Sequence, residues 1–170
     1  MKIVVIGVGK IKEKYIKDGI AEYSKRLSRF CDLEIIEVDD EPIPENLSPS
    51  MKIGVMKKEA DRIAKYLSQK TSKKGMGLKT GSVIVALDVK GEKHSSESFA
   101  SKMGLFFASG ISNIIFIIGG SLGLDKELLE SAQLRLSLSE LTFPHQLVRL
   151  ILLEQIYRAF KINNGEPYHK

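Results

Sequence analysis

The stretch Asn113-Ile114-Ile115-Phe116-Ile117-Ile118 runs directly into Gly119-Gly120-Ser121-Leu122-Gly123 and decides the fold. Five consecutive apolar residues without a charge are typical of a central parallel strand buried on both faces. Glycines directly after such a strand allow a tight turn and a close backbone approach. Because ligands of open α/β sheets bind outside the carboxyl ends of strands, residues 119–123 are a candidate binding loop for a nucleoside. A plain tight turn is an equally open interpretation.

Apolar runs alternate with helical patterns along the rest of the chain. This alternation predicts an α/β fold with a mostly parallel sheet and flanking helices. The other strands are expected at residues 3–8, 33–38, 82–87 and 134–138. Helices are expected at residues 11–30, 51–67, 95–109, 125–132 and 145–161. In the first helix the apolar positions, Tyr15 among them, recur at helical spacing and predict one buried face.

Length and composition indicate a globular protein. The 170 residues, 43% hydrophobic and 28% charged, predict a single domain over residues 1–170. No apolar stretch approaches the roughly 20 residues of a membrane helix, and the first residues lack the cleavage site of a signal peptide. Cys31 is the only cysteine, which excludes an intrachain disulfide and fits a cytoplasmic protein. Lysines among Thr, Ser and Gly predict a flexible basic loop at residues 70–81.

Charge and helix patterning point to partners. The 26 Lys and Arg residues against 21 Asp and Glu give a net charge of +5, which favours a polyanionic partner. The helix expected at 145–161 is apolar around most of its circumference and needs cover on two sides. A chain this small has little to cover the second side, so we expect a homodimer. Arg149 and Arg158 on that helix would each need a carboxylate or phosphate partner.

Other motifs leave alternatives open. Gly7-Val8-Gly9 begins like a dinucleotide fingerprint, but Lys12 stands where the third glycine belongs, so an NAD-type enzyme is a weak alternative. The histidines show no metal-ligand spacing, and no metal site is expected; His145 is interpreted as structural. Tyr168, His169 and Lys170 offer an aromatic ring, an imidazole and a cation, which could stack on a base and move a proton. A frayed tail without function is the alternative.

Several motifs in fixed order resemble the ribosomal RNA large-subunit methyltransferase H family from the first residue to the last. They are Val8-Gly9-Lys10, Glu13-Lys14-Tyr15, Ile118-Gly119-Gly120-Ser121-x-Gly123, Ser139-x-x-Thr142-Phe143-Pro144-His145-Gln146, Glu154-Gln155-x-Tyr157-Arg158-Ala159 and Tyr168-His169. The lysine-rich stretch at 69–81 departs from the family because it is longer than the family's usual connection there.

The resemblance implies a SPOUT-type α/β fold with a trefoil knot in its C-terminal part, working as a homodimer. Connection rules alone predict an unknotted sheet. The implied activity is methyl transfer from S-adenosylmethionine to N3 of a pseudouridine in helix 69 of 23S rRNA on the assembled 70S ribosome. The alternatives are a SPOUT methyltransferase acting on a different RNA site and a non-catalytic module that binds ribosomes.

The resemblance also implies site residues. The pocket for S-adenosylmethionine would consist of Leu87, Gly119, Leu138, Ser139, Glu140, Leu141, Thr142 and Phe143. His169 is the first candidate for the base that removes the N3 proton, with Tyr168 stacking on the target base. Arg149 or Arg158 would hold phosphate or the uracil carbonyls. RNA affinity would come from lysines of the first helix and of residues 70–81, and from the shape of the ribosome.

Overall fold

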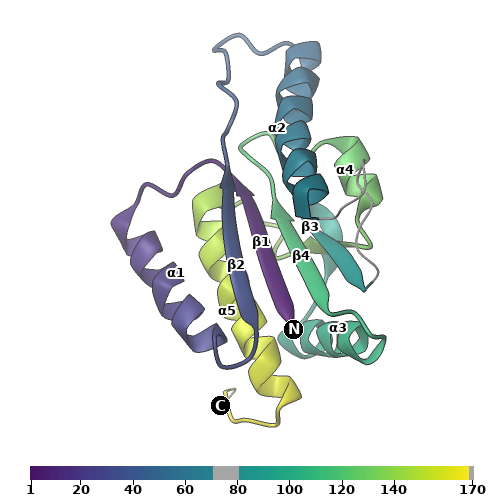
Figure 1. Ribbon diagram of the computed structural model, residues 1–170. Coiled ribbons are helices and arrows are strands. Elements are labelled where there is room, and N and C mark those ends of the chain that lie inside the picture. The colour runs from purple at the N-terminus through teal and green to yellow at the C-terminus, as the bar shows by residue number, and fades with distance from the viewer. Residues whose placement is uncertain (71–80, 169–170) are drawn as a thin grey trace.

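Five parallel strands form the centre of the protein, of which the computed structural model describes residues 1–70 and 81–168. The strands are β1 (Lys2–Val8), β2 (Asp32–Val38), β3 (Ser82–Lys93), β4 (Asn113–Ile118) and β5 (Leu134–Ser137), in the order β2-β1-β4-β3-β5 (Figure 1). Every pairing between neighbours is parallel. The α/β class and the parallel sheet are confirmed. β3 is longer than expected because it continues past a register shift between Leu87 and Glu92.

The central position of β4 explains its apolar sequence. β4 pairs with β1 on one side and with β3 on the other. Ile114, Phe116 and Ile118 enter the core on one face of the sheet, while Ile115 and Ile117 enter the core on the other. A strand with two buried faces has no position for a polar residue.

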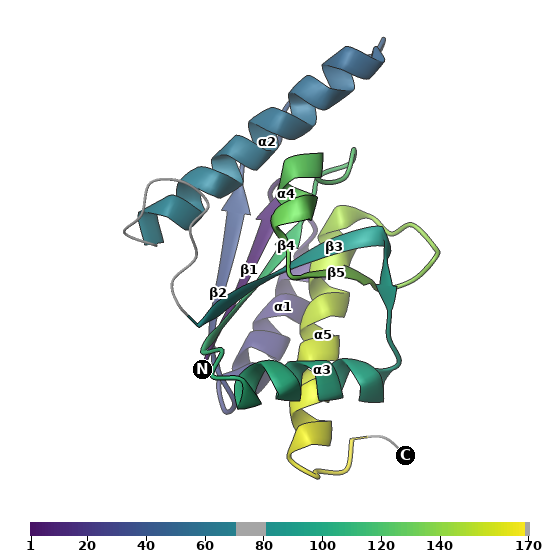
Figure 2. The ribbon, with the colours of Figure 1, turned by 90° about the vertical axis from the view of Figure 1, so that its right-hand side faces the viewer.

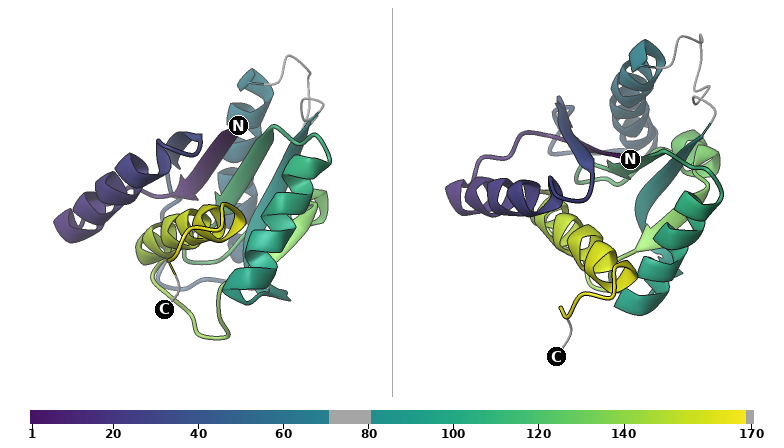
Figure 3. Two further views of the ribbon diagram at one scale, coloured as in Figure 1. Left: turned by 90° about the horizontal axis from the view of Figure 1, so that it is seen from below. Right: turned by 60° about the horizontal axis from the view of Figure 1, so that its bottom comes forward.

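Helices cover both faces of the sheet. Three of them, α1 (Lys14–Leu27), α3 (Ser96–Ala108) and α5 (His145–Asn163), pack on one face (Figure 3). On the other face α2 (Pro49–Lys70) and α4 (Lys126–Ser131) contribute Ile63, Leu67 and Leu128 to a second core (Figure 2). No helix in the described part of the chain is long and apolar enough to cross a membrane.

Two expectations about the helices need correction. The helix expected at 11–30 occupies only Lys14–Leu27, and Tyr15 is 66% exposed instead of buried. Tyr15 lies in the first turn, where the helix has only just begun, and the buried positions are Ile16, Ile20 and Leu27. The loop expected at 70–81 lies outside the described residues except for its two ends, since α2 continues to Lys70.

The last helix is covered largely by its own chain. α5 lies between α1 and α3 and buries Leu152, Leu153, Ile156 and Phe160 against them and the sheet (Figure 3). Much of the cover that the apolar circumference requires is therefore intramolecular. The homodimer and the trefoil knot both stay predictions.

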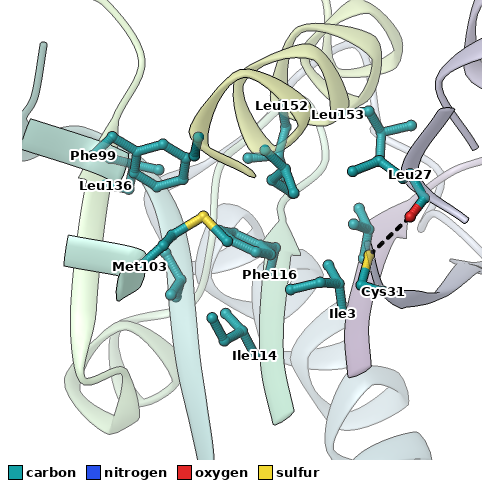
Figure 4. Close-up of a cluster of buried hydrophobic side chains, with 14 of the residues drawn as sticks. Ile3, Leu27, Cys31, Phe99, Met103, Ile114, Phe116, Leu136, Leu152 and Leu153 are labelled. Carbon is teal, nitrogen blue, oxygen red and sulfur yellow. Dashed lines mark hydrogen bonds between the residues drawn. The ribbon is translucent and has the colours of Figure 1, made fainter. Parts of the chain in front are cut away.

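Phe116 occupies the middle of the larger core. Figure 4 shows its ring between Met103 of α3 and Leu152 of α5, and its centroid lies 6.4 Å from that of Phe99. The Phe116 side chain has no exposed surface. It therefore joins the central strand to two of the helices that cover it.

Replacing Phe116 with alanine should lower the free energy of unfolding by about 3–5 kcal/mol, because the buried ring leaves a cavity. Urea denaturation measures this change. The matched control is Leu105→Ala on α3, whose side chain is 63% exposed and whose loss should cost less than about 0.5 kcal/mol. Equal losses in the two variants would contradict the assignment of this core.

Candidate functional site

A pocket of about 400 Å³ opens at the carboxyl end of the sheet. Three segments contribute most of its lining: the middle of β3 from Leu87, where its register shifts, the loop after β4 that starts at Gly119, and the segment between β5 and α5. Of the residues expected in a cofactor pocket, the lining includes Leu87, Gly119, Leu138, Ser139, Leu141, Thr142 and Phe143. Glu140 does not line the pocket, and its carboxylate pairs with Lys93 on the surface. Segments far apart in sequence thus meet where the sheet topology predicts a ligand.

The glycine loop turns back on itself at the wall of this pocket. Gly120 and Gly123 form an isolated bridge, and the Gly123 amide donates to the Gly120 carbonyl at 3.1 Å. A Cβ on Gly119 would lie 2.7 Å from the carbonyl carbon of Gly123, so a side chain there would force the turn open. The loop is therefore both a tight turn and a wall of the pocket. The two interpretations of the sequence, a plain turn and a ligand-binding loop, are compatible.

The segment after β5 is held by its serines. Ser137 Oγ donates to the Ser139 carbonyl at 3.1 Å, and Ser139 Oγ accepts from the Leu141 amide at 3.0 Å. Asp88, the one carboxylate in the described lining of the pocket, accepts from Arg135 Nε at 3.0 Å. The remaining lining is mostly apolar. Such a pocket suits a flat, largely apolar ligand that is oriented by backbone groups.

Arg149 is a buried cation with internal partners. Its side chain is 1% exposed, and its Nη2 donates to the Val8 and Gly9 carbonyls at 2.6 and 2.5 Å. Its Nη1 donates to Glu37 Oε1 at 3.1 Å. Burial lowers the pKa of Arg149, and Glu37 opposes that shift. The predicted carboxylate partner exists, but the guanidinium has no surface that could meet RNA, so we assign it a positioning role.

The same contact explains the glycine at position 7. A Cβ on Gly7 would lie 2.3 Å from Arg149 Nε, which the arginine could not tolerate without moving. Gly7 therefore makes room for a side chain of this chain and not for a dinucleotide. The NAD-type alternative loses the feature on which it depended.

Arg158 and Tyr168 lie far from the pocket. Arg158 donates to Glu154 Oε1 at 2.6 Å, and its guanidinium lies 4.8 Å from the ring centroid of Tyr168. Burial and a hydrogen bond to Tyr23 raise the pKa of Tyr168 to about 12. From His145 at the pocket to Arg158, α5 advances about 20 Å at its usual rise per residue. The last turn of α5 lies near the amino ends of the strands (Figure 1), and His169 lies outside the described residues.

His145 is a site residue that sequence reasoning missed. It is the first residue of α5, and it lines the main pocket. Burial lowers the pKa of His145, with Arg149 acting in the same direction and Asp40 opposing both. Its position directly after Pro144, at the start of a helix that faces the strand ends, could have indicated that it lies in the site.

A second pocket of about 210 Å³ adjoins the first. The two pockets share Gly120, Ser121 and His145. The rest of the second lining is Val8, Asp40, Glu41, Pro42, Ile43 and Glu59. Nothing in the sequence patterns predicted this site. Within residues 1–70 and 81–168, no three His, Cys, Asp or Glu side chains are grouped so that they could hold a metal ion.

Comparisons with known proteins match the whole chain. A family model described as "Predicted SPOUT methyltransferase" matches residues 1–169. A protein of Acetivibrio thermocellus named Ribosomal RNA large subunit methyltransferase H is 59% identical over 170 residues, which is 100% of both chains. Proteins of the same name from Carboxydothermus hydrogenoformans and Ruminiclostridium cellulolyticum are 54% and 53% identical, also over 100% of both chains.

Glu37→Ala should lower the free energy of unfolding by about 2–4 kcal/mol, because it leaves the buried Arg149 without its carboxylate. Chemical denaturation measures the loss. Glu22→Ala is the control, since it removes a carboxylate from the exposed Glu22–Arg26 pair on α1 and should cost less than about 1 kcal/mol. A loss no larger than that of the control would show that Arg149 does not depend on Glu37.

The imidazole of His145 should titrate below its ordinary pKa of 6.5, because burial disfavours the charged form. Asp40→Asn should lower this pKa further, since it removes the nearby negative charge. NMR shifts of the ring protons against pH give both values. Asp39→Asn serves as the control because Asp39 pairs with Lys10 instead. A pKa of His145 that is unmoved by Asp40→Asn would contradict the described geometry.

Proposed function

The chain belongs to the SPOUT methyltransferase family, and from this premise we propose that it methylates N3 of a pseudouridine in helix 69 of 23S rRNA. The observation that carries the proposal is full-length identity of 53–59% to relatives named Ribosomal RNA large subunit methyltransferase H. The substrate is the assembled 70S ribosome. The whole chain acts as one SPOUT domain in the cytoplasm.

S-adenosylmethionine, the methyl donor of SPOUT enzymes, fits the main pocket in size and chemistry. Pockets that bind small molecules usually measure about 300–1,000 Å³ and are mostly apolar, as is this one at about 400 Å³. Leu87, Leu138 and Leu141 would enclose the adenine, with backbone groups at Gly119 and residues 138–143 as hydrogen-bond partners. When bound, the cofactor supplies a methyl group on a positively charged sulfur.

The protein's own part in the reaction is alignment, exclusion of water and proton removal. Direct displacement needs the target nitrogen in line with the methyl group, which a rigid pocket at the strand ends can enforce. The nitrogen must also lose its proton to a base within hydrogen-bond reach. We assign that base to His169 and the stacking contact with the target base to Tyr168, which Arg158 positions through its ring contact.

Tyr168 cannot reach the pocket of its own chain in the described conformation, because about 20 Å of helix separates Arg158 beside it from His145 at the pocket. A homodimer resolves this separation if the tail of one protomer completes the pocket of its partner. RNA affinity would come from lysines on α1, such as Lys14, Lys17 and Lys25, through contacts with phosphates. The two alternatives, another RNA target and a non-catalytic ribosome-binding module, are separated by the assay below.

Methyl incorporation from labelled S-adenosylmethionine should occur on 70S ribosomes whose pseudouridine lacks its methyl group, and not on free 23S rRNA. Gly119→Val should abolish it, because its side chain would open the turn at the pocket wall. Leu105→Ala, away from the pocket, is the control. Label at another nucleotide would support the first alternative, and ribosome binding without label would support the second.

Mixing two inactive variants should restore activity if the tail acts in the partner's pocket. One variant carries Gly119→Val, and the other carries Tyr168→Ala with His169→Ala. Random exchange of subunits should recover about a quarter of the wild-type rate, since half of the dimers then hold one complete site. Each variant mixed with itself is the control. No recovery, despite mixed dimers shown by mass spectrometry, would place the tail in its own pocket.

A further inference from the structure

The second pocket is acidic. Asp40, Glu41 and Glu59 line it, and its described lining includes no Lys or Arg. Glu41 is neutralised, because it pairs with Lys58 at 2.6 Å and with Arg62 at 2.5 Å. Among the described residues neither Asp40 nor Glu59 forms an ion pair, although Arg62 acts on Glu59 from a longer distance. A cavity with two unpaired carboxylates is suited to a positively charged ligand.

Glu59 is the unusual member of this group. It lies on α2 and is only 5% exposed. Its Oε1 accepts from the Glu41 amide at 3.0 Å, whereas its Oε2 has no hydrogen-bond partner among the described residues. Oε2 is not fully buried and lies open to the second cavity, so a ligand in that cavity can reach it.

The Glu59 carboxylate lies against the wall between the two pockets. A Cβ on Gly120 would come within 3.0 Å of Oε2 and 3.2 Å of Oε1. Gly120 lines both pockets, together with Ser121 and His145. The absence of a side chain at position 120 therefore lets the carboxylate reach the edge of the main pocket.

The described lining of the main pocket has no free carboxylate for the amino-acid end of its proposed ligand. S-adenosylmethionine ends in an amino acid with an α-ammonium group, which seeks a carboxylate. The only carboxylate in the described lining of the main pocket, Asp88, already pairs with Arg135. Across the shared wall, the second pocket offers the carboxylates of Glu59 and Asp40.

We propose that the Glu59 carboxylate, supported by Asp40, binds the α-ammonium group of S-adenosylmethionine and so anchors the amino-acid end of the cofactor in the second pocket. This inference rests on the proposed function, because it takes the adenosine to lie in the main pocket. It makes Glu59 a specificity residue that distinguishes the complete cofactor from adenosine derivatives without the amino acid.

The electrostatics of Glu59 agree with this role. Burial raises the pKa of the free carboxyl group, and Asp40 and Glu41 raise it further, while Arg62 and the Glu41 amide lower it. A bound ammonium would stabilise the anion and reverse that shift. The ligand would thus supply the charge that the protein lacks at this position.

Binding measured by calorimetry tests the proposal without turnover. S-adenosylhomocysteine and 5′-methylthioadenosine are both uncharged at sulfur, and only the first carries the amino acid. Glu59→Gln should weaken S-adenosylhomocysteine and S-adenosylmethionine by roughly tenfold to a hundredfold, the usual range for a hydrogen bond to a charged group. It should leave 5′-methylthioadenosine unchanged. Asp61→Asn, an exposed acid two residues further along α2, is the matched control and should change neither affinity.

Every other pattern overturns the proposal. Equal weakening of both ligands by Glu59→Gln would mean that Glu59 only supports the pocket wall. Weakening of S-adenosylmethionine alone would mean that it senses the sulfur charge. Unchanged affinities with lost methylation would assign it to the RNA substrate. Failure of the wild-type protein to bind any of the three ligands would instead contradict the proposed function itself.

If Glu59→Gln does not fold, the affinities of a series of ligand analogues for the wild-type protein test the same proposal. The analogue of S-adenosylhomocysteine without its amino group should bind at least roughly tenfold more weakly. The analogue without its carboxylate should bind as well as the parent, because the described lining of the second pocket offers no Lys or Arg to that group. The reverse order of affinities would contradict an ammonium site.

Discussion

The buried guanidinium of Arg149 is the constraint on which the carboxyl end of the sheet depends. It joins α5 to the carbonyls of Val8 and Gly9 at the end of β1 and to Glu37 of β2, and so ties the helix to two strands that already pair with each other. A charge that deep must be satisfied where it lies, so its partners hold the helix start in one place. Since His145 lies one turn earlier on α5, the same contact fixes the residue that both pockets share.

The glycine loop after β4 divides two chemically different spaces. On one side are leucines and backbone groups that suit a nucleoside; on the other are carboxylates that suit a cation. The wall between them is thin because Gly120 has no side chain. A ligand with an apolar aromatic end and a cationic end could occupy both spaces at once, and S-adenosylmethionine is such a ligand. The loop thereby separates an apolar space from an acidic one.

Local patterns predicted the elements well and the contacts between them poorly. The run 113–118 predicted a central strand, and sequence patterns located α3 and α5 to within a few residues. Arg149 and Glu37, however, are 112 residues apart, and no periodicity relates them. In the sequence, Glu59 is one charged residue among many on a basic helix. Its burial depends on the β2–α2 connection, which folds over this position and which no local pattern reveals. The pocket residues at 138–143 came from family resemblance, since apolar and small residues in a loop carry no pattern of their own.

The length of α5 bears on how catalysis is divided. A helix is stiff, so its first turn at the pocket and its last turn beside Tyr168 cannot approach each other in one chain. In the proposed pocket, binding of the methyl donor would need only the strand ends and loops, which each chain supplies by itself. Proton removal needs a base, and the described lining offers the imidazole of His145 and the carboxylate of Asp88, which already pairs with Arg135. A second copy would add the groups of its tail. If the catalytic base reaches the pocket only from a second chain, a single chain could bind the methyl donor but could not transfer the methyl group. The ribosome would then bind to a surface formed by both protomers.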